Sequence, residues 1–403
     1  MELISHDQVN QQERARILVE FGASDREIEE LLVYNQNVFA QGNLDSSFQL
    51  PLQSEPHVAI WQEYVTEAKT NGAWSTLQNV LPQLKFPIKA GISQTEAYRA
   101  ATRRGVSPKV TSTTTGLVLQ QPEVLQLEIH QSLAGKIPLI HTSNRDDFVA
   151  MVRAITKRNE PVEIPHSMGA CMVGGYNNWE RISRYRQQWV QSNSDNSELA
   201  WSKEFKQLIA QKELYQDRFM ILSDGCYSNI RAAELGLTET QWRRLSLTIR
   251  LEHECTHYFT RRLFHSMRNN LLDELIADYR GIVAAIGSYR ADWFLHFLGL
   301  ESSGYREGGR MQNYRGQLSD GAFKVLQQLV RSAAQNLEDF EGNYLDRRDI
   351  GLPASPRQLA IENQTIMLMA LTSLTIEELA DSSAGDRLKQ VTEDMKHLST
   401  CYR

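Results

Sequence analysis

The segment LEHECTHYF, residues 251–259, constrains this chain more than any other part of its sequence. His253 and His257 are four residues apart, so on a helix they lie one turn apart on the same face. Two neutral imidazoles placed in this way can bind one zinc ion at about 2.0–2.1 Å. Glu254 is one step round the helix and can reach a water molecule beside the ion without being a ligand. The segment therefore predicts a helix with two metal ligands and a proton-accepting carboxylate.

A hydrolytic zinc site needs a third protein ligand and one open position. The pattern in which a glycine and a third histidine follow the second histidine is excluded, because those positions hold Thr260 and Leu263. The segment LLDELIADYRG instead supplies Glu274 from a following helix, which we expect from Asn270 to about Ser288. Asp278 lies one turn further along that helix and can accept a hydrogen bond from the far nitrogen of a ligating histidine.

His253-Glu254-x-x-His257 followed by Glu274-x-x-x-Asp278 resembles the gluzincin metallopeptidases, the thermolysin-like class. The resemblance implies that His253, His257 and Glu274 bind one zinc ion, that Glu254 is the general base and that Asp278 supports a ligand. It also implies hydrolysis of a peptide or amide bond by zinc-activated water. The wider sequence, with IRLEHECTHYFTRR, NNLLDELIADYRG and IPHSMGACMVGGYNNW, resembles an uncharacterised bacterial family of metallohydrolases.

The group that would stabilise negative charge on the substrate's carbonyl oxygen is left open by the sequence. The candidates are tyrosine, arginine and histidine side chains near the motif or in turn-rich segments, namely Tyr258, Tyr279, Arg250, Tyr227 and His166. The glycine-rich segment 166–179 can be a strand that lines the substrate cleft. It can equally be a bulged strand and turn with close backbone contacts.

The pattern of caps and apolar runs predicts an α+β protein that is predominantly helical, with a zincin-like two-helix metal site and a small β-sheet in its middle region. We expect a helical region over 1–115, a mixed α/β region with a cleft-lining strand over 116–235, and a helical region with the metal site over 236–403. Residues 111–116, TSTTTG, are the expected linker. Helix starts are expected at Ser24, Ser93, Asn144, Thr238, Asn270 and Thr375, and strands at 124–129, 137–140, 161–165 and 218–222.

Small residues on the helix that is expected to carry Glu274 would allow it to approach the histidine-bearing helix closely. Such an approach is required if both helices bind one ion. The small residues are Ala277, Gly281, Ala284 and Ala285. Ordinary tight core packing explains the same pattern, and both explanations can hold together.

The formal charge of −6 disfavours binding to phosphate backbones, so no nucleic-acid partner is expected. A helix-turn-helix near Gly22 is disfavoured for the same reason, because its second helix is acidic. No apolar run is long enough to span a membrane, and the four cysteines form no disulfide framework. We therefore expect a cytoplasmic protein that acts on a peptide or a small amide.

Two alternatives remain open. The first is a non-catalytic scaffold protein in which zinc only stabilises the fold, and the second is a hydrolase of a small-molecule amide. An open metal position beside Glu254 would favour an enzyme, whereas a fourth protein ligand would favour a structural site. A deep closed pocket would favour a small substrate over a peptide. The sequence does not determine the oligomeric state.

Overall fold

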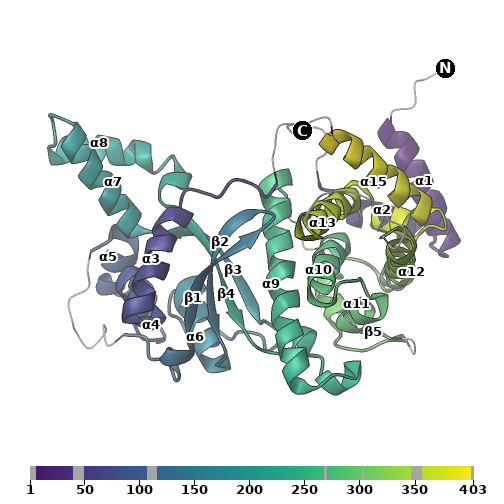
Figure 1. The fold of residues 1–403 in the computed structure, drawn as a ribbon, viewed down its shortest axis with the longest axis horizontal. Helices are drawn as coiled ribbons and strands as arrows, with labels where there is room; N and C mark the ends of the chain where they lie inside the picture. The colour runs from purple at the N-terminus through teal and green to yellow at the C-terminus, as the bar shows by residue number, and fades with distance from the viewer. Residues whose placement is uncertain are drawn as a thin grey trace. The chain divides into compact units, whose positions relative to one another are not determined.

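The computed structural model describes residues 6–39, 50–106, 116–266, 270–301, 304–345 and 356–400. The chain forms two compact units, each described by itself. The helical unit comprises Met1–Gln49 and Ile230–Arg403, and the sheet unit comprises Leu50–Asn229. These units do not coincide with the regions 1–115, 116–235 and 236–403 expected from the sequence, because the first helices pack with the last ones. The fold is predominantly helical with a small mixed sheet, which confirms the predicted α+β class (Figure 1).

The sheet has four strands in the order β1-β2-β4-β3. Their bounds are Gln126–Ser132 for β1, Gly135–Thr142 for β2, Ala170–Asn177 for β3 and Gln216–Ser223 for β4. β1 and β2 form an antiparallel hairpin, β2 and β4 are parallel with Ile140 opposite Ile221, and β3 is an antiparallel edge strand. The central strand β4 contains the continuous buried run FMIL, because both of its faces are covered.

Three of the four expected strands are present, and the one expected at 161–165 is not. This segment has no strand assignment, although Ile164 still packs into the core. Its two prolines lack the N–H that a sheet ladder needs, and the Val162 N–H donates locally to the Glu160 carbonyl at 2.8 Å. The segment 166–179 contains β3, whose register shifts between Gly174 and Tyr176, so the bulged-strand interpretation is confirmed.

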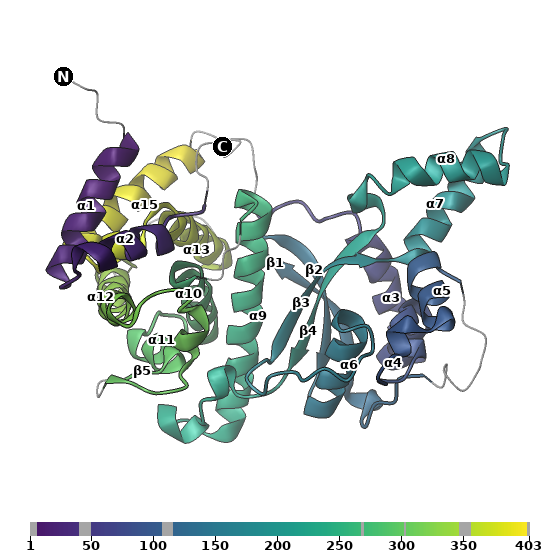
Figure 2. The ribbon, with the colours of Figure 1, turned by 180° about the vertical axis from the view of Figure 1, so that it is seen from behind.

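The helices of the sheet unit flank the strands (Figures 1 and 2). They are α3 (Val58–Asn71), α4 (Ala73–Val80), α5 (Glu96–Arg104), α6 (Arg145–Thr156), α7 (Trp179–Ser192) and α8 (Glu198–Leu208). The core between them and the sheet includes Trp61, Phe148, Ile140, Phe219 and Ile221. This apolar layer is what holds the predicted mixed α/β region together.

The expected cap of α5 is corrected by the structure. Thr95, not Ser93, is the N-cap, and its hydroxyl accepts a hydrogen bond from the Tyr98 N–H at 3.3 Å. Ser93 lies in a short 3-10 turn, η3 (Ile92–Gln94), where its own N–H donates to Glu160 at 3.0 Å. The helix ends as expected at Gly105, whose φ of 65° is left-handed.

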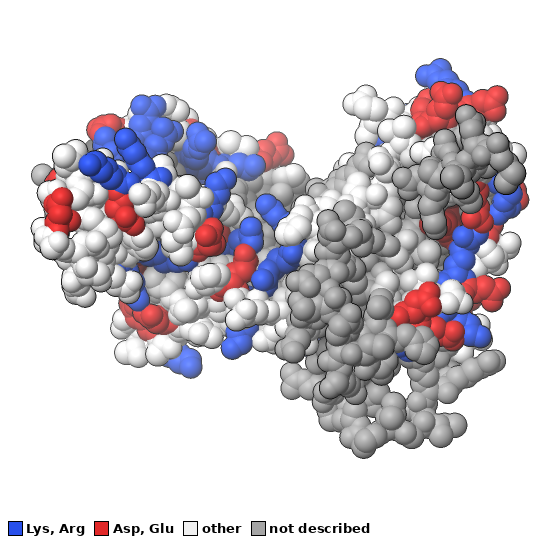
Figure 3. Space-filling view, turned by 90° about the horizontal axis from the view of Figure 1, so that it is seen from above, with Lys and Arg blue, Asp and Glu red and all other residues white. Residues whose placement is uncertain are grey.

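Lysine and arginine side chains gather over part of the visible face of the sheet unit, with acidic side chains among them (Figure 3). On α7, Arg184 lies 2.7 Å from Glu63 and 2.6 Å from Glu180, and Arg186 pairs with Glu198. These arginines are therefore engaged in ion pairs. The absence of a nucleic-acid partner stays a prediction.

The helical unit contains the other helices and a two-strand ribbon. They are α1 (His6–Glu20), α2 (Asp25–Tyr34), α9 (Glu239–Phe264), α10 (Leu271–Ile286), α11 (Ala291–Leu298), β5 (Leu300–Glu301), β6 (Gly304–Tyr305), α12 (Asp320–Leu345), α13 (Pro356–Ser373), α14 (Ile376–Ala380) and α15 (Ala384–Thr400). The predicted caps Ser24, Thr238, Asn270 and Thr375 precede α2, α9, α10 and α14, and Asn144 precedes α6 in the other unit.

The first two helices are members of this bundle. α1 packs on α14 and α2 packs on α12. The Arg14 guanidinium forms a buried ion pair with Glu377 at 3.0 Å, and the Asn35 amide donates to the same carboxylate at 3.1 Å. The first two helices therefore belong to a helical bundle with α12 and α14.

α9 and α10 lie against each other (Figure 1). A Cβ atom on Gly281 would be 2.7 Å from the carbonyl oxygen of Ile249, which is closer than real Cβ contacts. The glycine therefore permits the close approach of the two helices that the small-residue face predicted.

No described helix is long and apolar enough to cross a membrane. Within the described ranges, Cys171, Cys226 and Cys255 form no disulfide. The expected linker lies almost wholly outside the described residues, since only Gly116 of the segment 111–116 is included.

Candidate metal centre

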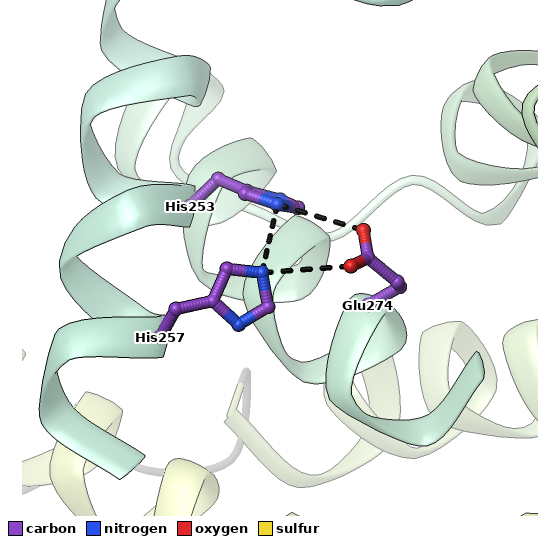
Figure 4. Close-up of side chains that lie close together, drawn as sticks. All are labelled: His253, His257 and Glu274. Atoms are coloured by element: carbon purple, nitrogen blue, oxygen red, sulfur yellow. Dashed lines mark hydrogen bonds and ion pairs between the residues drawn. The ribbon is translucent and has the colours of Figure 1, made fainter. Parts of the chain in front are cut away.

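The metal cluster, as we call it, consists of His253, His257 and Glu274. The two histidines project from one face of α9, four residues apart, and Glu274 projects toward them from the first turn of α10 (Figure 4). That turn is fixed by Asn270, whose side-chain oxygen accepts the Asp273 N–H at 3.1 Å. The three residues that the sequence proposed as ligands are thus brought together.

The distances within the metal cluster match those expected around one ion. The Nε2 atoms of His253 and His257 are 3.1 Å apart. The Glu274 oxygens lie 3.5 Å from Nε2 of His253 and 3.6 Å from Nε2 of His257. Ligands at 2.0–2.1 Å in a tetrahedron are separated by about 3.3 Å. The three ligand atoms therefore converge on one point with a spacing that an ion of the size of zinc would fit.

Each imidazole has a carboxylate near its Nδ1 atom. Nδ1 of His253 is 2.7 Å from Oδ1 of Asp278, and Nδ1 of His257 is 3.3 Å from Oδ1 of Asp273 without a hydrogen bond between them. The contact with Asp278 favours the His253 tautomer that carries hydrogen on Nδ1. With hydrogen on Nδ1 of both rings, the two Nε2 lone pairs would face each other at 3.1 Å and repel unless a cation lay between them.

The metal cluster is buried, with His253 8%, His257 6% and Glu274 3% exposed. Oε2 of Glu274 is buried and accepts no hydrogen bond from any residue that the structure describes. A buried acceptor without a donor is costly, and a cation at this point would remove that cost. The donor set of two imidazoles and one carboxylate is therefore a chemical fit for zinc.

The surroundings of the metal cluster lower the pKa of Glu274 and of the neighbouring Asp278. Burial favours the neutral acid, but the adjacent His257 ring and the nearby positive charges hold the pKa of Glu274 well below its usual range. Burial likewise opposes ionisation of Asp278, yet Arg310 and His253 lower its pKa. Burial lowers the pKa of His257, but Asp273 and Glu274 outweigh this and raise it well above the ordinary value. The cluster thus attracts positive charge.

Sequence reasoning missed Asp273, Arg310 and Tyr314. Arg310 and Tyr314 belong to a 3-10 turn, η8 (Arg310–Tyr314). The Arg310 guanidinium contacts Asp278 and lies 3.9 Å from Oε2 of Glu274. Burial raises the pKa of Tyr314, and the contact of its hydroxyl with Glu274 adds to the rise. Asp273 could have been found as the neighbour of Glu274, whereas no local signal marks the other two.

Glu254, the expected base, has a different environment from the ligands. It follows His253 directly on α9 but is only partly buried. Among the described residues, its carboxylate forms no ion pair or hydrogen bond. The carboxylate is thus available to a water molecule or a substrate.

The other sequence candidates occupy varied environments. Tyr258 is 2% exposed, with Arg262 stacked over its ring at 5.6 Å, and Arg250 is 4% exposed. The Tyr279 hydroxyl donates to Glu341 at 2.9 Å. Tyr227 is buried and His166 is exposed, both in the sheet unit. Their roles in stabilising a substrate oxygen stay predictions.

Comparison with known proteins identifies a sequence family for this chain but no individual relative. No curated protein matches the chain, and no solved structure matches it either. A match to one sequence family extends over residues 16–383. The chain therefore belongs to the family described as "Family of unknown function (DUF7005)".

Proposed function

We propose that this protein is a zinc-dependent hydrolase, namely a metallopeptidase of the gluzincin type. The observation that carries the proposal is the convergence of three buried ligand atoms, with the two Nε2 atoms 3.1 Å apart and each imidazole backed by a carboxylate. Such carboxylate–histidine pairs fix ligand geometry in metal sites. The choice of a peptide substrate rests on the motif resemblance alone.

Each residue has a separate task in this proposal. His253, His257 and Glu274 would hold the ion, which when bound acidifies water and polarises a carbonyl group. Asp278 holds His253 by its Nδ1 atom, and Asp273 lies 3.3 Å from Nδ1 of His257. Glu254 accepts a proton from the attacking water and delivers it to the leaving nitrogen. Its partial exposure supports this role, because a base must be reached by both water and substrate.

The first experiment measures metal content. We expect about one zinc per chain in the purified protein by elemental mass spectrometry, and none in His253→Ala. The matched control is His296→Ala, which removes a histidine of the same unit that pairs with Glu234 at 3.2 Å. Zinc retained in full by His253→Ala, or lost equally from His296→Ala, contradicts the ligand assignment.

The second experiment measures turnover on a library of quenched fluorescent peptides and a panel of small amides. Glu254→Gln should keep its zinc and lose turnover by about 10²–10⁴-fold. Glu252→Gln is the control, because Glu252 lies on the same helix but is engaged with Arg280 at 2.8 Å. Wild-type turnover by Glu254→Gln would rule out this base.

A structural zinc site is the second candidate, and the burial of all three ligands favours it. Structural sites have four protein ligands and no open position. Cobalt-substituted protein distinguishes the two, since an open position lets an added anion such as azide change the visible absorption of the ion. An unchanged spectrum, together with no turnover on any substrate, would favour the structural role.

A further inference from the structure

The turn η8 brings a cation to two of the carboxylates at the metal centre. The Arg310 guanidinium contacts Asp278, which holds His253, and lies 3.9 Å from Oε2 of the ligand Glu274. Its side chain is only 16% exposed. Arg310 is thus a nearly buried cation beside both carboxylates.

Contacts at both ends of η8 hold the turn in position. Gly309 lies so close to α11 that a Cβ on it would be 2.7 Å from the Leu298 carbonyl oxygen. At the other end of the turn, the Tyr34 hydroxyl donates to the Tyr314 carbonyl at 2.7 Å. Arg310 therefore projects from a fixed turn rather than reaching in from a free loop.

Arg310 lies beside two of the three buried carboxylates of this region. Asp273, Glu274 and Asp278 are all buried. Arg310 contributes one permanent positive charge next to Asp278 and Glu274. A bound divalent ion would place further positive charge at the same carboxylates. Removal of Arg310 should therefore destabilise the metal-free protein more than the metal-loaded protein.

We propose that Arg310 is a positioning residue that stands in for part of the metal's charge, holding Asp278 and Glu274 in place when no ion is bound. The inference rests on the proposed metal site. It predicts that Arg310 stabilises the metal-free protein more than the metal-loaded protein, because the bound ion takes over part of its electrostatic role.

The test compares thermal unfolding of full-length variants after chelation and after addition of excess Zn²⁺. Arg310→Gln should unfold roughly 5 °C below wild type without metal, and zinc should remove at least half of this difference. The matched control is Arg280→Gln. Arg280 is 14% exposed and pairs with Glu252, so its loss should cost the same with and without zinc.

Arg310→Lys separates charge from shape and covers the case in which Arg310→Gln fails to fold. Lysine keeps the charge, so this variant should retain most of the metal-free stability. The proposal is overturned if lysine is as damaging as glutamine, or if the glutamine difference is the same with and without zinc. If zinc does not stabilise the wild type at all, the metal site itself is wrong, and the metal-free comparison of lysine with glutamine still decides the charge role.

Discussion

The buried carboxylate Asp217 of the sheet unit and the buried carboxylates at the metal centre of the helical unit have opposite environments. In the sheet unit, Asp217 is 0% exposed and accepts hydrogen bonds from Trp61 at 2.8 Å, Asn178 at 2.6 Å and Arg181 at 2.8 Å. In the helical unit, the carboxylates face imidazoles whose Nε2 lone pairs point at one another, and a Glu274 oxygen lacks a described donor. A buried carboxylate whose oxygens accept hydrogen bonds from protein donors needs no further ligand. Buried acceptors that converge on one point without donors need a cation.

The largest effect that this comparison predicts is for Asp217→Ala. The substitution leaves two donors and the Arg181 charge without their buried acceptor, so unfolding free energy should fall by about 3–5 kcal/mol. Urea denaturation followed by tryptophan fluorescence measures the loss. Glu63→Ala is the control, since Glu63 and its partner Arg184 are 58% and 43% exposed and should contribute at most about 1 kcal/mol. Zinc content should stay unchanged, and metal loss in Asp217→Ala would contradict the separation of the two roles.

The second prediction concerns pH and the sheet unit. Burial lowers the pKa of His57 to about 4, although Glu55 favours the charged ring. The unfolded chain takes up this proton near pH 6.5 and the folded unit does not, so stability is full above pH 6.5 and is lost as pH falls toward 4. The loss should reach up to about 3 kcal/mol at the lower end. His57→Gln should flatten the dependence of stability on pH over this range, and a slope equal to wild type would show that other groups cause it.

The third prediction sharpens the metal side of the comparison. Asp278→Asn should weaken zinc affinity by about 10–100-fold, because the amide no longer fixes His253 as strongly. Competition with a coloured chelator measures the affinity. Asp292→Asn is the control, as Asp292 is an exposed partner of Arg290. Equal affinities in the two variants would show that Asp278 does not act on the ion.

The smallest expected effect tests whether helix spacing supports the site. Gly281→Ala would place a Cβ 2.7 Å from the Ile249 carbonyl, so α9 and α10 must move apart at a cost of about 1–2 kcal/mol. Gly342→Ala on α12 meets no atom within 4 Å and should be neutral or stabilising by up to about 1 kcal/mol. Chemical denaturation with and without zinc compares them. Equal stabilities of the two variants would mean that the close approach is not needed.

Local patterns account for the parts of the structure that the sequence predicted. Local sequence determines two kinds of feature that were predicted correctly. One is the helix caps Thr238 and Asn270, and the other is the four-residue spacing that places His253 and His257 on one helix face. The approach of Glu274 to the histidines was expected from the motif resemblance. The strand expected at 161–165 failed because two prolines outweigh its apolar content.

The contacts that could not be predicted depend on tertiary packing. Arg310 lies 32 residues beyond Asp278, and only the course of α11 and the ribbon brings it back to α10. The choice of Thr95 over Ser93 as a cap depends on Glu160, which occupies the backbone N–H of Ser93 from a distant part of the chain. Neither contact has a signature in the local sequence.

The helical unit is discontinuous, and this has a consequence for how the protein is made. Arg14 leaves the ribosome before its partner Glu377, which is 363 positions later in the chain. During synthesis, the helices α1 and α2 must therefore wait while the whole inserted unit, Leu50–Asn229, and then the metal-binding helices emerge. This bundle cannot close until Glu377 has been made, so a chain truncated before Glu377 would leave α1 and α2 without the carboxylate that anchors them.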